Sequence, residues 1–222
     1  SMDEVVPNVW VGDASTARKI VLGEDDSTRK FTHVLDASDE EHYTDDESKH
    51  KVSVFKANMC DHGSTLLSEK NWTVLNESLS FIDKALEAKG KVLIHCYAGV
   101  SRSATMCVAW LMSSKRWTVE KALGFLQGKR SQVFPIAYAW QSCEWEHHLT
   151  SDKKLVLSKH DFSKPADGNL LQLLKLIRKE KKMMFPMIEN SPEIWKEHRA
   201  FRAQSRAKQE KLSNKRDKQG CG

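Results

Sequence analysis

Four short apolar stretches in the first 150 residues are rich in β-branched and aromatic side chains, as is typical of β-strands. They lie at residues 8–12, 31–35, 51–57 and 91–95. The segments between and after them carry apolar residues every three or four positions, which predicts amphipathic helices. Strands that alternate with helices predict an α/β fold, with a central, mostly parallel sheet of about five strands and helices on both faces.

The helical pattern is clearest before the fourth strand, where apolar residues recur along one face. We expect this face in the core; its residues are Trp72, Leu75, Leu79, Ile82 and Leu86. Asp13 or Ser15 can cap a short helix over residues 16–22. Thr118 can cap a later helix, and a last helix is predicted over residues 135–149.

The stretch from Val92 to Ser103 joins the fourth strand to a helix through a short loop. Such a loop can direct consecutive backbone N–H groups, together with the positive end of the helix dipole, at one point, which makes an anion site. Gly99 allows the backbone to curl, and Arg102 offers a planar fork of donors suited to two phosphate oxygens. Cys96 opens the loop, where the same positive surroundings favour the nucleophilic thiolate.

A buried cysteine at a strand end is more often an inert packing residue, so Cys96 alone would indicate no function. The spacing His-Cys-x-x-Gly-x-x-Arg-Ser favours a phosphate site instead, because it places a glycine, two serines and an arginine where a core would hold apolar side chains. This arrangement supports attack of the thiolate on phosphorus, which gives a phosphocysteine that water then hydrolyses.

Residues 95–103, His-Cys-Tyr-Ala-Gly-Val-Ser-Arg-Ser, resemble the signature of the cysteine-dependent protein tyrosine phosphatase superfamily. The Ala-Gly-x-Ser-Arg-Ser form is similar to its dual-specificity branch, and the chain resembles the small atypical members from about Val9 to Leu149. The resemblance implies a protein phosphatase that hydrolyses phosphotyrosine and phosphoserine or phosphothreonine. Its chemistry needs no metal and no other cofactor.

The roles of the loop residues follow from this chemistry and this resemblance. Cys96 attacks, while the loop backbone and one guanidinium hold the phosphoryl oxygens. The phosphate-binding residues are Tyr97, Ala98, Gly99, Val100, Ser101 and Arg102. The resemblance implies that Ser103 donates a hydrogen bond that helps the thiolate leave, and that His95 orients the loop and tunes the thiolate. Asp36 stands where the branch often has asparagine and supports the loop from beneath.

Asp61 is the candidate general acid, because the departing substrate oxygen requires a proton from a loop that faces the phosphate site. It is the only carboxylate between residues 52 and 68, and it precedes Cys96 by 35 residues. Three alternatives stay open. Asp61 could instead cap a turn, an overlay on family members places Met59 at the acid position, and His62 is a weaker substitute acid.

The five cysteines are widely spaced and lack the paired Cys-x-x-Cys pattern of zinc sites. A thiolate enzyme also needs reducing surroundings, so we expect the cytoplasm, with the nucleus as a second location. One redox hypothesis concerns Cys60, which could approach Cys96 when the loop of Asp61 closes and form a disulfide under oxidation. Cys60 could equally be a packing residue.

Charge divides the chain into two regions. Residues 151–222 hold 18 Lys and Arg against 9 Asp and Glu, whereas residues 1–150 hold 17 against 21. We therefore expect a catalytic domain over residues 1–150 and a basic helical extension over 151–222 whose end is disordered. The extension is either a solvated helix or a segment that binds an acidic partner or a membrane surface. No nucleic acid is expected as a partner.

No apolar run approaches the roughly 20 residues of a membrane span, so we expect a soluble protein. The acidic stretch at residues 39–47 is expected to be a solvated loop, with selection of charged substrates as its alternative. Two other functions remain open. One is a phosphate-binding module with little or no turnover. The other is a phosphatase for phosphoinositide or RNA, although the loop lacks the added lysine that lipid-specific relatives usually have.

Overall fold

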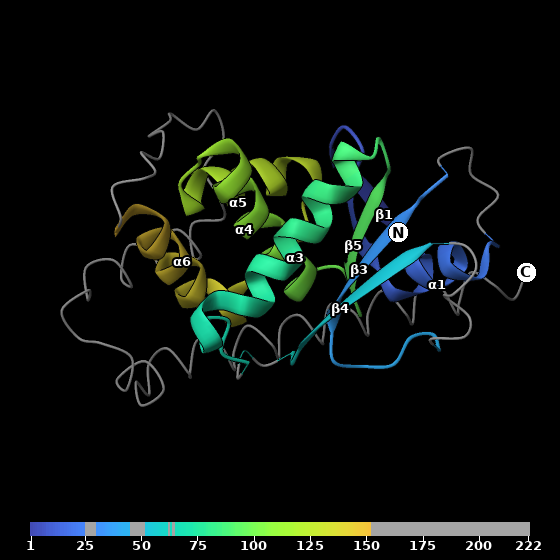
Figure 1. Cartoon of the computed structure of the whole chain (residues 1–222), viewed down its shortest axis with the longest axis horizontal. Helices are drawn as coiled ribbons and strands as arrows, with labels where there is room; N and C mark the ends of the chain where they lie inside the picture. Colours follow the sequence, from blue (N-terminus) through green and yellow to red (C-terminus); the bar gives the residue numbers. More distant parts are fainter. Residues whose placement is uncertain (25–29, 45–51, 62, 64, 152–222) are drawn as a thin grey trace, which may run out of the picture. The chain divides into compact units, whose positions relative to one another are not determined.

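The computed structural model describes the greater part of the first 151 residues (Figure 1). The described ranges are 1–24, 30–44, 52–61, 63 and 65–151. The predicted basic extension, apart from Ser151, and the alternative acid His62 lie outside them.

Five strands form one sheet in the order β1-β2-β5-β3-β4. The strands are β1 (Met2–Val6), β2 (Val9–Asp13), β3 (His33–Ser38), β4 (Ser53–Met59) and β5 (Val92–Cys96). β1 pairs antiparallel with β2, and the other three pairings are parallel. The predicted mostly parallel sheet is therefore confirmed. β1 was not predicted, because this edge strand buries only Val5 and carries two acidic residues.

The helices follow the predicted alternation with strands. They are α1 (Ala14–Leu22), α3 (Glu69–Glu87), α4 (Arg102–Lys115), α5 (Val119–Lys129) and α6 (Ala139–Ser151), with a short 3₁₀ helix η1 (Ile136–Tyr138) before α6. Asp13 caps α1, because its Oδ1 atom accepts a hydrogen bond from the Thr16 N–H at 2.9 Å. Thr118 caps α5 in the same way through the Lys121 N–H.

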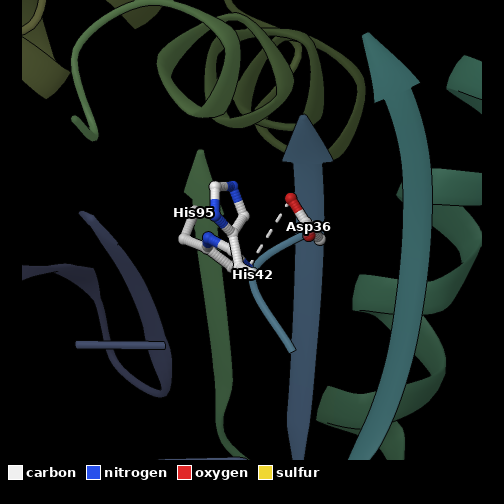
Figure 2. A group of neighbouring side chains, drawn as sticks. All are labelled: Asp36, His42 and His95. Atoms are coloured by element: carbon white, nitrogen blue, oxygen red, sulfur yellow. Dashed lines mark ion pairs between the residues drawn. The ribbon is translucent and has the colours of Figure 1, made fainter. Parts of the chain in front are cut away.

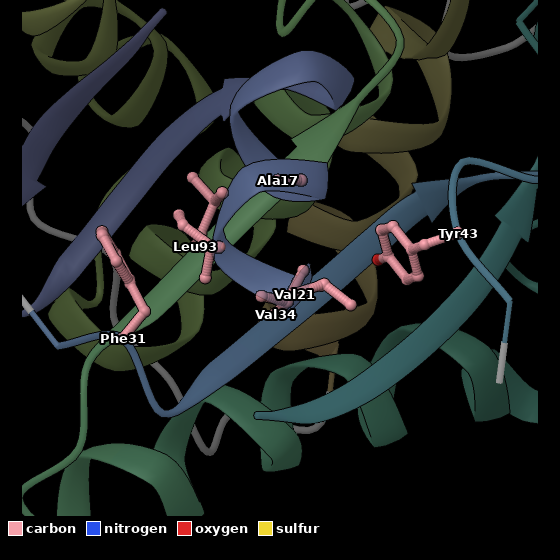
Figure 3. Close-up of a cluster of buried hydrophobic side chains, with 7 residues drawn as sticks. Ala17, Val21, Phe31, Val34, Tyr43 and Leu93 are labelled. Atoms are coloured by element: carbon pink, nitrogen blue, oxygen red, sulfur yellow. The ribbon is translucent and has the colours of Figure 1, made fainter. Parts of the chain in front are cut away.

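Helices cover both faces of the sheet (Figure 1). On one face, Ala17 and Val21 of α1 pack against Val34 of β3 and Leu93 of β5 (Figure 3). Side chains alternate across a strand, so Ile94 points to the opposite face, against which α3 and α4 pack. This confirms the predicted helices on both faces.

α4 lies at the centre of the helical layer, with α3, α5 and α6 packed around it. Its residues are buried without interruption from Arg102 to Met112, so the helix is packed on all sides over this length. The N-terminus of α4 and the carboxyl ends of β3, β4 and β5 meet at one edge of the sheet, where open α/β sheets bind their ligands. None of the helices in the described ranges is long and apolar enough to cross a bilayer.

Candidate active site

Cys96 is the last residue of β5 and Arg102 is the first of α4, so residues 97–101 form the connection that we call the phosphate loop. Gly99 has a φ of +69°, in the left-handed region. A Cβ atom at this position would lie 2.5 Å from the carbonyl oxygen of Gly12. Only glycine therefore allows the loop to curl this close to β2.

The carbonyl groups of the phosphate loop are held from outside. The bonds run from Ala14 N–H to Tyr97 O at 3.0 Å, from Arg130 Nε to Gly99 O at 2.9 Å and from Phe134 N–H to Val100 O at 2.8 Å. Within each peptide unit the C=O and N–H groups point in opposite directions. Holding the carbonyl groups outward therefore directs the loop N–H groups toward its centre, as an anion site requires.

The cysteine and serine that flank the phosphate loop lie side by side. Cys96 Sγ is 3.3 Å from Ser103 Oγ, which belongs to the first turn of α4. Both residues are buried, with Cys96 only 2% exposed. The sulfur therefore lies next to a hydroxyl donor and near the positive end of a helix dipole, which stabilises an anionic sulfur.

Arg102 is held in place by one end of its guanidinium. Glu40 accepts two hydrogen bonds there, from Nη1 at 2.7 Å and from Nη2 at 3.1 Å. Nη1 also donates to Asp39 Oδ1 at 3.2 Å and to Met59 O at 3.3 Å. Nε is buried and has no hydrogen-bond partner among the described residues. Glu40, Asp39 and Met59 therefore bind the Nη1–Nη2 end of the guanidinium and not its Nε edge.

Charge keeps both members of this pair ionised. Burial opposes the charged form of Arg102, but the hydrogen bonds to Glu40 and the charges of Cys96 and Asp61 raise the pKa of Arg102 above its usual value. Partial burial likewise opposes the carboxylate of Glu40, yet its hydrogen bonds to Arg102 and the nearby positive charge lower the pKa of Glu40. The pair is a charge-assisted, two-point contact.

Asp61 follows β4 and lies at the Nε edge of the Arg102 guanidinium, which Glu40 does not contact. Its Oδ1 atom is 3.5 Å from Arg102 Nε, and its side chain is 49% exposed. The side chain of Met59, which an overlay would place at the acid position, is fully buried. The structure therefore brings Asp61 beside the guanidinium, while its role as the acid stays a prediction.

Asp36 and His95 lie opposite each other on β3 and β5, and both are fully buried (Figure 2). Asp36 was expected to support the phosphate loop as an acceptor only, without the donors that an asparagine would add. Its Oδ1 atom accepts hydrogen bonds from the N–H and the hydroxyl of Ser38, and it comes within 3.7 Å of His95 Nε2. A carboxylate lacks the donors of an asparagine, so it binds the nearest donors, which belong to the segment after β3.

His95 links the end of β5 to that same segment. Its Nε2 atom is 2.9 Å from the hydroxyl of Tyr43, and its Nδ1 atom is 3.4 Å from the carbonyl oxygen of Cys96. Burial lowers the pKa of His95 to about 4, against the opposing effect of Asp36. The ring is therefore neutral at pH 7 and fixes the position of the strand end.

Asp36, His42 and His95 each offer one ligand atom, and these atoms lie within 4.8 Å of one another, as a divalent metal would require (Figure 2). Hydroxyl groups already engage both imidazoles, because His42 Nε2 is 2.8 Å from Ser38 Oγ and His95 Nε2 contacts Tyr43. We therefore describe the cluster as a hydrogen-bond network.

Cys60 contacts the start of the last helical segment. Its Sγ atom is 3.3 Å from Thr65 Oγ1 and 3.8 Å from the hydroxyl of Tyr138, which in turn donates to Cys60 O at 2.6 Å. Cys60 and Cys96 are not joined by a disulfide in this structure. The disulfide between them stays a prediction about the oxidised protein.

Two acidic residues at this site were not predicted as part of it. Asp39 and Glu40 belong to the stretch that we expected to be a solvated loop, yet both bind Arg102. A usable signal exists in the sequence, because these residues directly follow β3, whose carboxyl end lies beside that of β5. Their charge alone had suggested solvent.

Arg130 was missed altogether. Its side chain is 1% exposed, and it donates to Gly99 O through Nε and to Asp3 Oδ2 through Nη1 at 2.5 Å. It therefore connects the phosphate loop to β1. The surrounding sequence, Gly-Lys-Arg-Ser, is typical of an exposed helix end and gives no signal of this contact.

Comparison with known proteins identifies the family. A family profile described as "Dual specificity phosphatase, catalytic domain" matches residues 9–148. Dual specificity protein phosphatase 4 of Gallus gallus is 49% identical over 74 residues, which are 33% of this chain and 20% of that protein. The human dual specificity protein phosphatase 4 is 46% identical over 74 residues, 33% of this chain and 19% of its own length. The chain thus spans about a fifth of the length of these curated relatives.

Solved structures share the fold. Human DUSP28 superposes with a TM-score of 0.57 at 21% identity, covering 67% of this chain and 94% of that one. PTPMT1 in complex with PI(5)P gives a TM-score of 0.54 at 24% identity, over 68% of this chain and 98% of its own. These likenesses concern the fold alone. Because the family profile covers the whole sheet from β2 onward, together with the phosphate loop and the helices around it, the chain belongs to the dual specificity phosphatase catalytic-domain family.

Proposed function

We propose that this chain is a cysteine-dependent phosphatase that hydrolyses phosphotyrosine and phosphoserine or phosphothreonine in proteins. One observation supports this most strongly. Asp61 Oδ1 lies 3.5 Å from Arg102 Nε, at the edge of the guanidinium that Glu40 does not bind, and the charges of both Asp61 and Cys96 act on Arg102. Nucleophile, anion-binding group and proton donor therefore come from three separate segments to one place.

In the first step, the Cys96 thiolate attacks phosphorus, so that an S–P bond forms as the P–O ester bond breaks. The loop N–H groups and the Nε edge of Arg102 hold the three other oxygens as charge develops. Asp61 in its acid form gives its proton to the departing oxygen, which leaves as the hydroxyl of the side chain. The products are the free hydroxyl and a phosphocysteine.

In the second step, water attacks the phosphocysteine. Asp61, now a carboxylate, takes a proton from the water, the new P–O bond forms and the S–P bond breaks. The Ser103 hydroxyl, 3.3 Å from Cys96 Sγ, donates to the sulfur as it regains its charge. Inorganic phosphate leaves, and the enzyme is back in its starting state, with Asp61 protonated and the sulfur a thiolate.

The charges around Arg102 support a protein substrate over a phosphoinositide. Asp39, Glu40 and Asp61 are each between 43% and 49% exposed and lie within 3.5 Å of the guanidinium. A headgroup with further phosphates would bring more negative charge against these carboxylates. PTPMT1 has been solved with PI(5)P, so a lipid phosphate is the alternative to test.

The test uses the full chain and an aryl phosphate. Wild type should hydrolyse it with inhibition by vanadate, and Cys96→Ser should abolish turnover, because a hydroxyl in this site does not ionise. A panel of phosphotyrosine, phosphoserine and phosphothreonine peptides, with PI(5)P beside them, then identifies the substrate class. Binding of inorganic phosphate without any turnover would indicate the module without catalysis, and preference for PI(5)P would replace the protein substrate.

We also propose the cytoplasm and nucleus as the location, because the thiolate needs a reducing compartment. The excess of basic residues in 151–222 supports an acidic partner or an anionic membrane surface for that region.

A further inference from the structure

We propose that Glu40 is a positioning residue for Arg102: it fixes the Nη1–Nη2 end of the guanidinium and so turns the Nε edge toward the phosphoryl group. This inference rests on the proposed phosphatase function, since it assigns a task within the same site. Nothing in the signature around Cys96 points to Glu40, which lies 62 residues before Arg102 in the chain.

The argument begins with the edges of the guanidinium. Glu40 occupies the end edge with two bonds, at 2.7 Å and 3.1 Å. The outer side of Nη1 is taken by Met59 O and Asp39 Oδ1. The side edge, which begins at Nε, has no hydrogen-bond partner among the described residues, and the carboxylate that approaches it is Asp61, with Oδ1 3.5 Å from Nε. A phosphoryl group can therefore bind Arg102 while Glu40 remains in place.

A two-point contact does what a single contact cannot. Two parallel N–H···O bonds fix the plane of the guanidinium as well as its position. Asp39 accepts a hydrogen bond from Nη1 alone, so the guanidinium plane could still rotate about that single hydrogen bond. Fixing the plane matters because the donors must meet phosphoryl oxygens in the transition state, and a misplacement of about 1 Å can cost roughly 100-fold in rate.

Glu40 is itself held from both sides. Before it, Ser38 is bound by the buried Asp36. After it, the carbonyl oxygen of His42 accepts a hydrogen bond from Arg18 Nη1 at 2.9 Å, and Tyr43 OH lies 2.9 Å from His95 Nε2. These contacts join the segment to β3, α1 and β5. Glu40 therefore acts from a fixed place, although its side chain is 43% exposed.

The main test replaces Glu40 by glutamine. Glutamine keeps the shape of the side chain but removes its charge, and its NH2 group cannot accept one of the two hydrogen bonds from Arg102. We expect kcat/KM for an aryl phosphate to fall roughly 10- to 100-fold, and the inhibition constant for vanadate to rise in parallel. The melting temperature should stay within a few degrees, because the side chain is half exposed. Glu41→Gln, an exposed glutamate one residue along, is the matched control and should leave both constants unchanged.

A double-mutant cycle separates positioning from a general structural effect. If Glu40 acts only through Arg102, Glu40→Gln should cost less than about threefold in an Arg102→Lys background, where the two-point contact cannot form. Glu40→Asp, which keeps the charge but is too short to reach both nitrogens, should give an intermediate loss. It also replaces Glu40→Gln in the test if that variant does not fold.

Two results would overturn the inference. One is equal activity in Glu40→Gln and Glu41→Gln. The other is a gain in kcat/KM with tighter vanadate binding, which would mean that Glu40 competes with the phosphoryl group for Arg102. Failure of the proposed function looks different, because wild type would then hydrolyse no phosphate ester. Vanadate binding to wild type and Glu40→Gln, measured by calorimetry, would still decide the role of Glu40.

Discussion

Single residues around the phosphate loop differ in how much freedom their surroundings leave them. Gly99 is enclosed by the Gly12 carbonyl group and by Arg130, and its backbone is left-handed. Gly128, in α5, has nothing within 4 Å of where a Cβ atom would lie. The two glycines therefore form a matched pair.

Gly99→Ala should destabilise the protein by about 2 kcal/mol or more, through backbone strain and the clash with Gly12. Gly128→Ala should be neutral or stabilising by up to about 1 kcal/mol, because alanine favours a helix. Urea unfolding of both variants measures the difference. Equal stabilities would contradict the geometry described for the phosphate loop.

The acid role of Asp61 predicts a dependence on the leaving group. In Asp61→Asn, kcat should fall about 100-fold for phenyl phosphate, whose oxygen needs a proton, and much less for 4-nitrophenyl phosphate, whose oxygen does not. Asp39→Asn removes the same charge beside Arg102 and should affect both substrates alike. Steady-state rates with the two esters check this, and an equal loss on both in Asp61→Asn would move the acid elsewhere.

Two helices of the fold carry polar side chains that are shielded from solvent, near the end of α5 and within α6. Arg130, at the end of α5, joins β1 to the phosphate loop, and α6 carries a partly buried carboxyl group at Glu144, whose Oε2 atom is inaccessible to solvent. Both are polar groups in a poorly solvated position, so both have measurable consequences for stability.

Arg130→Met should lower the free energy of unfolding by about 1–3 kcal/mol, because it leaves the buried carbonyl oxygen of Gly99 without its donor and removes the ion pair with the half-exposed Asp3. It should also raise KM, since the loop carbonyl groups lose their outer support. Lys115→Met, at the exposed end of α4, is the control and should change neither quantity. Urea unfolding and steady-state kinetics measure both effects; an unchanged KM in Arg130→Met would limit its role to stability.

Burial raises the pKa of Glu144 to about 7, and Oε2 has no partner among the described residues. The folded state therefore holds this proton more tightly than the unfolded state. The associated stability is fully present below about pH 4.5 and is lost as the pH rises through 7. Glu144→Gln should thus raise the melting temperature at pH 8, by about 2–4 °C per kcal/mol gained, and change it little at pH 4.5.

The exposed Glu77 of α3 provides the comparison for this prediction. Glu77→Gln should give the same melting temperature as wild type at both pH values, because this side chain is exposed. A gain for Glu144→Gln that does not depend on pH would mean that its effect comes from packing instead of from the buried charge.

The whole chain combines an acidic region with a basic one. Every side chain that forms a hydrogen bond or ion pair with the phosphate loop or Arg102 in the described residues comes before residue 131, and the five strands described there end at Cys96. We therefore predict that removing residues 165–222 leaves kcat/KM for an aryl phosphate within about twofold. If residues 151–222 bind anionic surfaces, the same truncation should abolish sedimentation with phosphatidylserine vesicles. A large loss of turnover would show that the basic region contributes to the site.

Sequence patterns were sufficient where structure is local. The strand, loop and helix from Val92 to Lys115 are contiguous, so spacing alone places Cys96, Gly99, Arg102 and Ser103 relative to one another. The alternation of strands and helices likewise predicts the sheet. The edge strand β1 was not predicted, because a strand with one neighbour buries few side chains and therefore shows only a weak alternation of apolar and polar residues.

The sequence by itself determined the family, the phosphate loop and its candidate nucleophile, because these depend on neighbouring residues. Only the tertiary structure decided that Glu40 binds Arg102, that Arg130 holds the loop and that Asp36 binds Ser38 instead of the loop. Ionic and hydrogen-bonding contacts carry no periodicity, and a charged residue looks the same in sequence whether it meets water or a buried guanidinium. Which of these it meets is set by strands and helices that come together from distant parts of the chain.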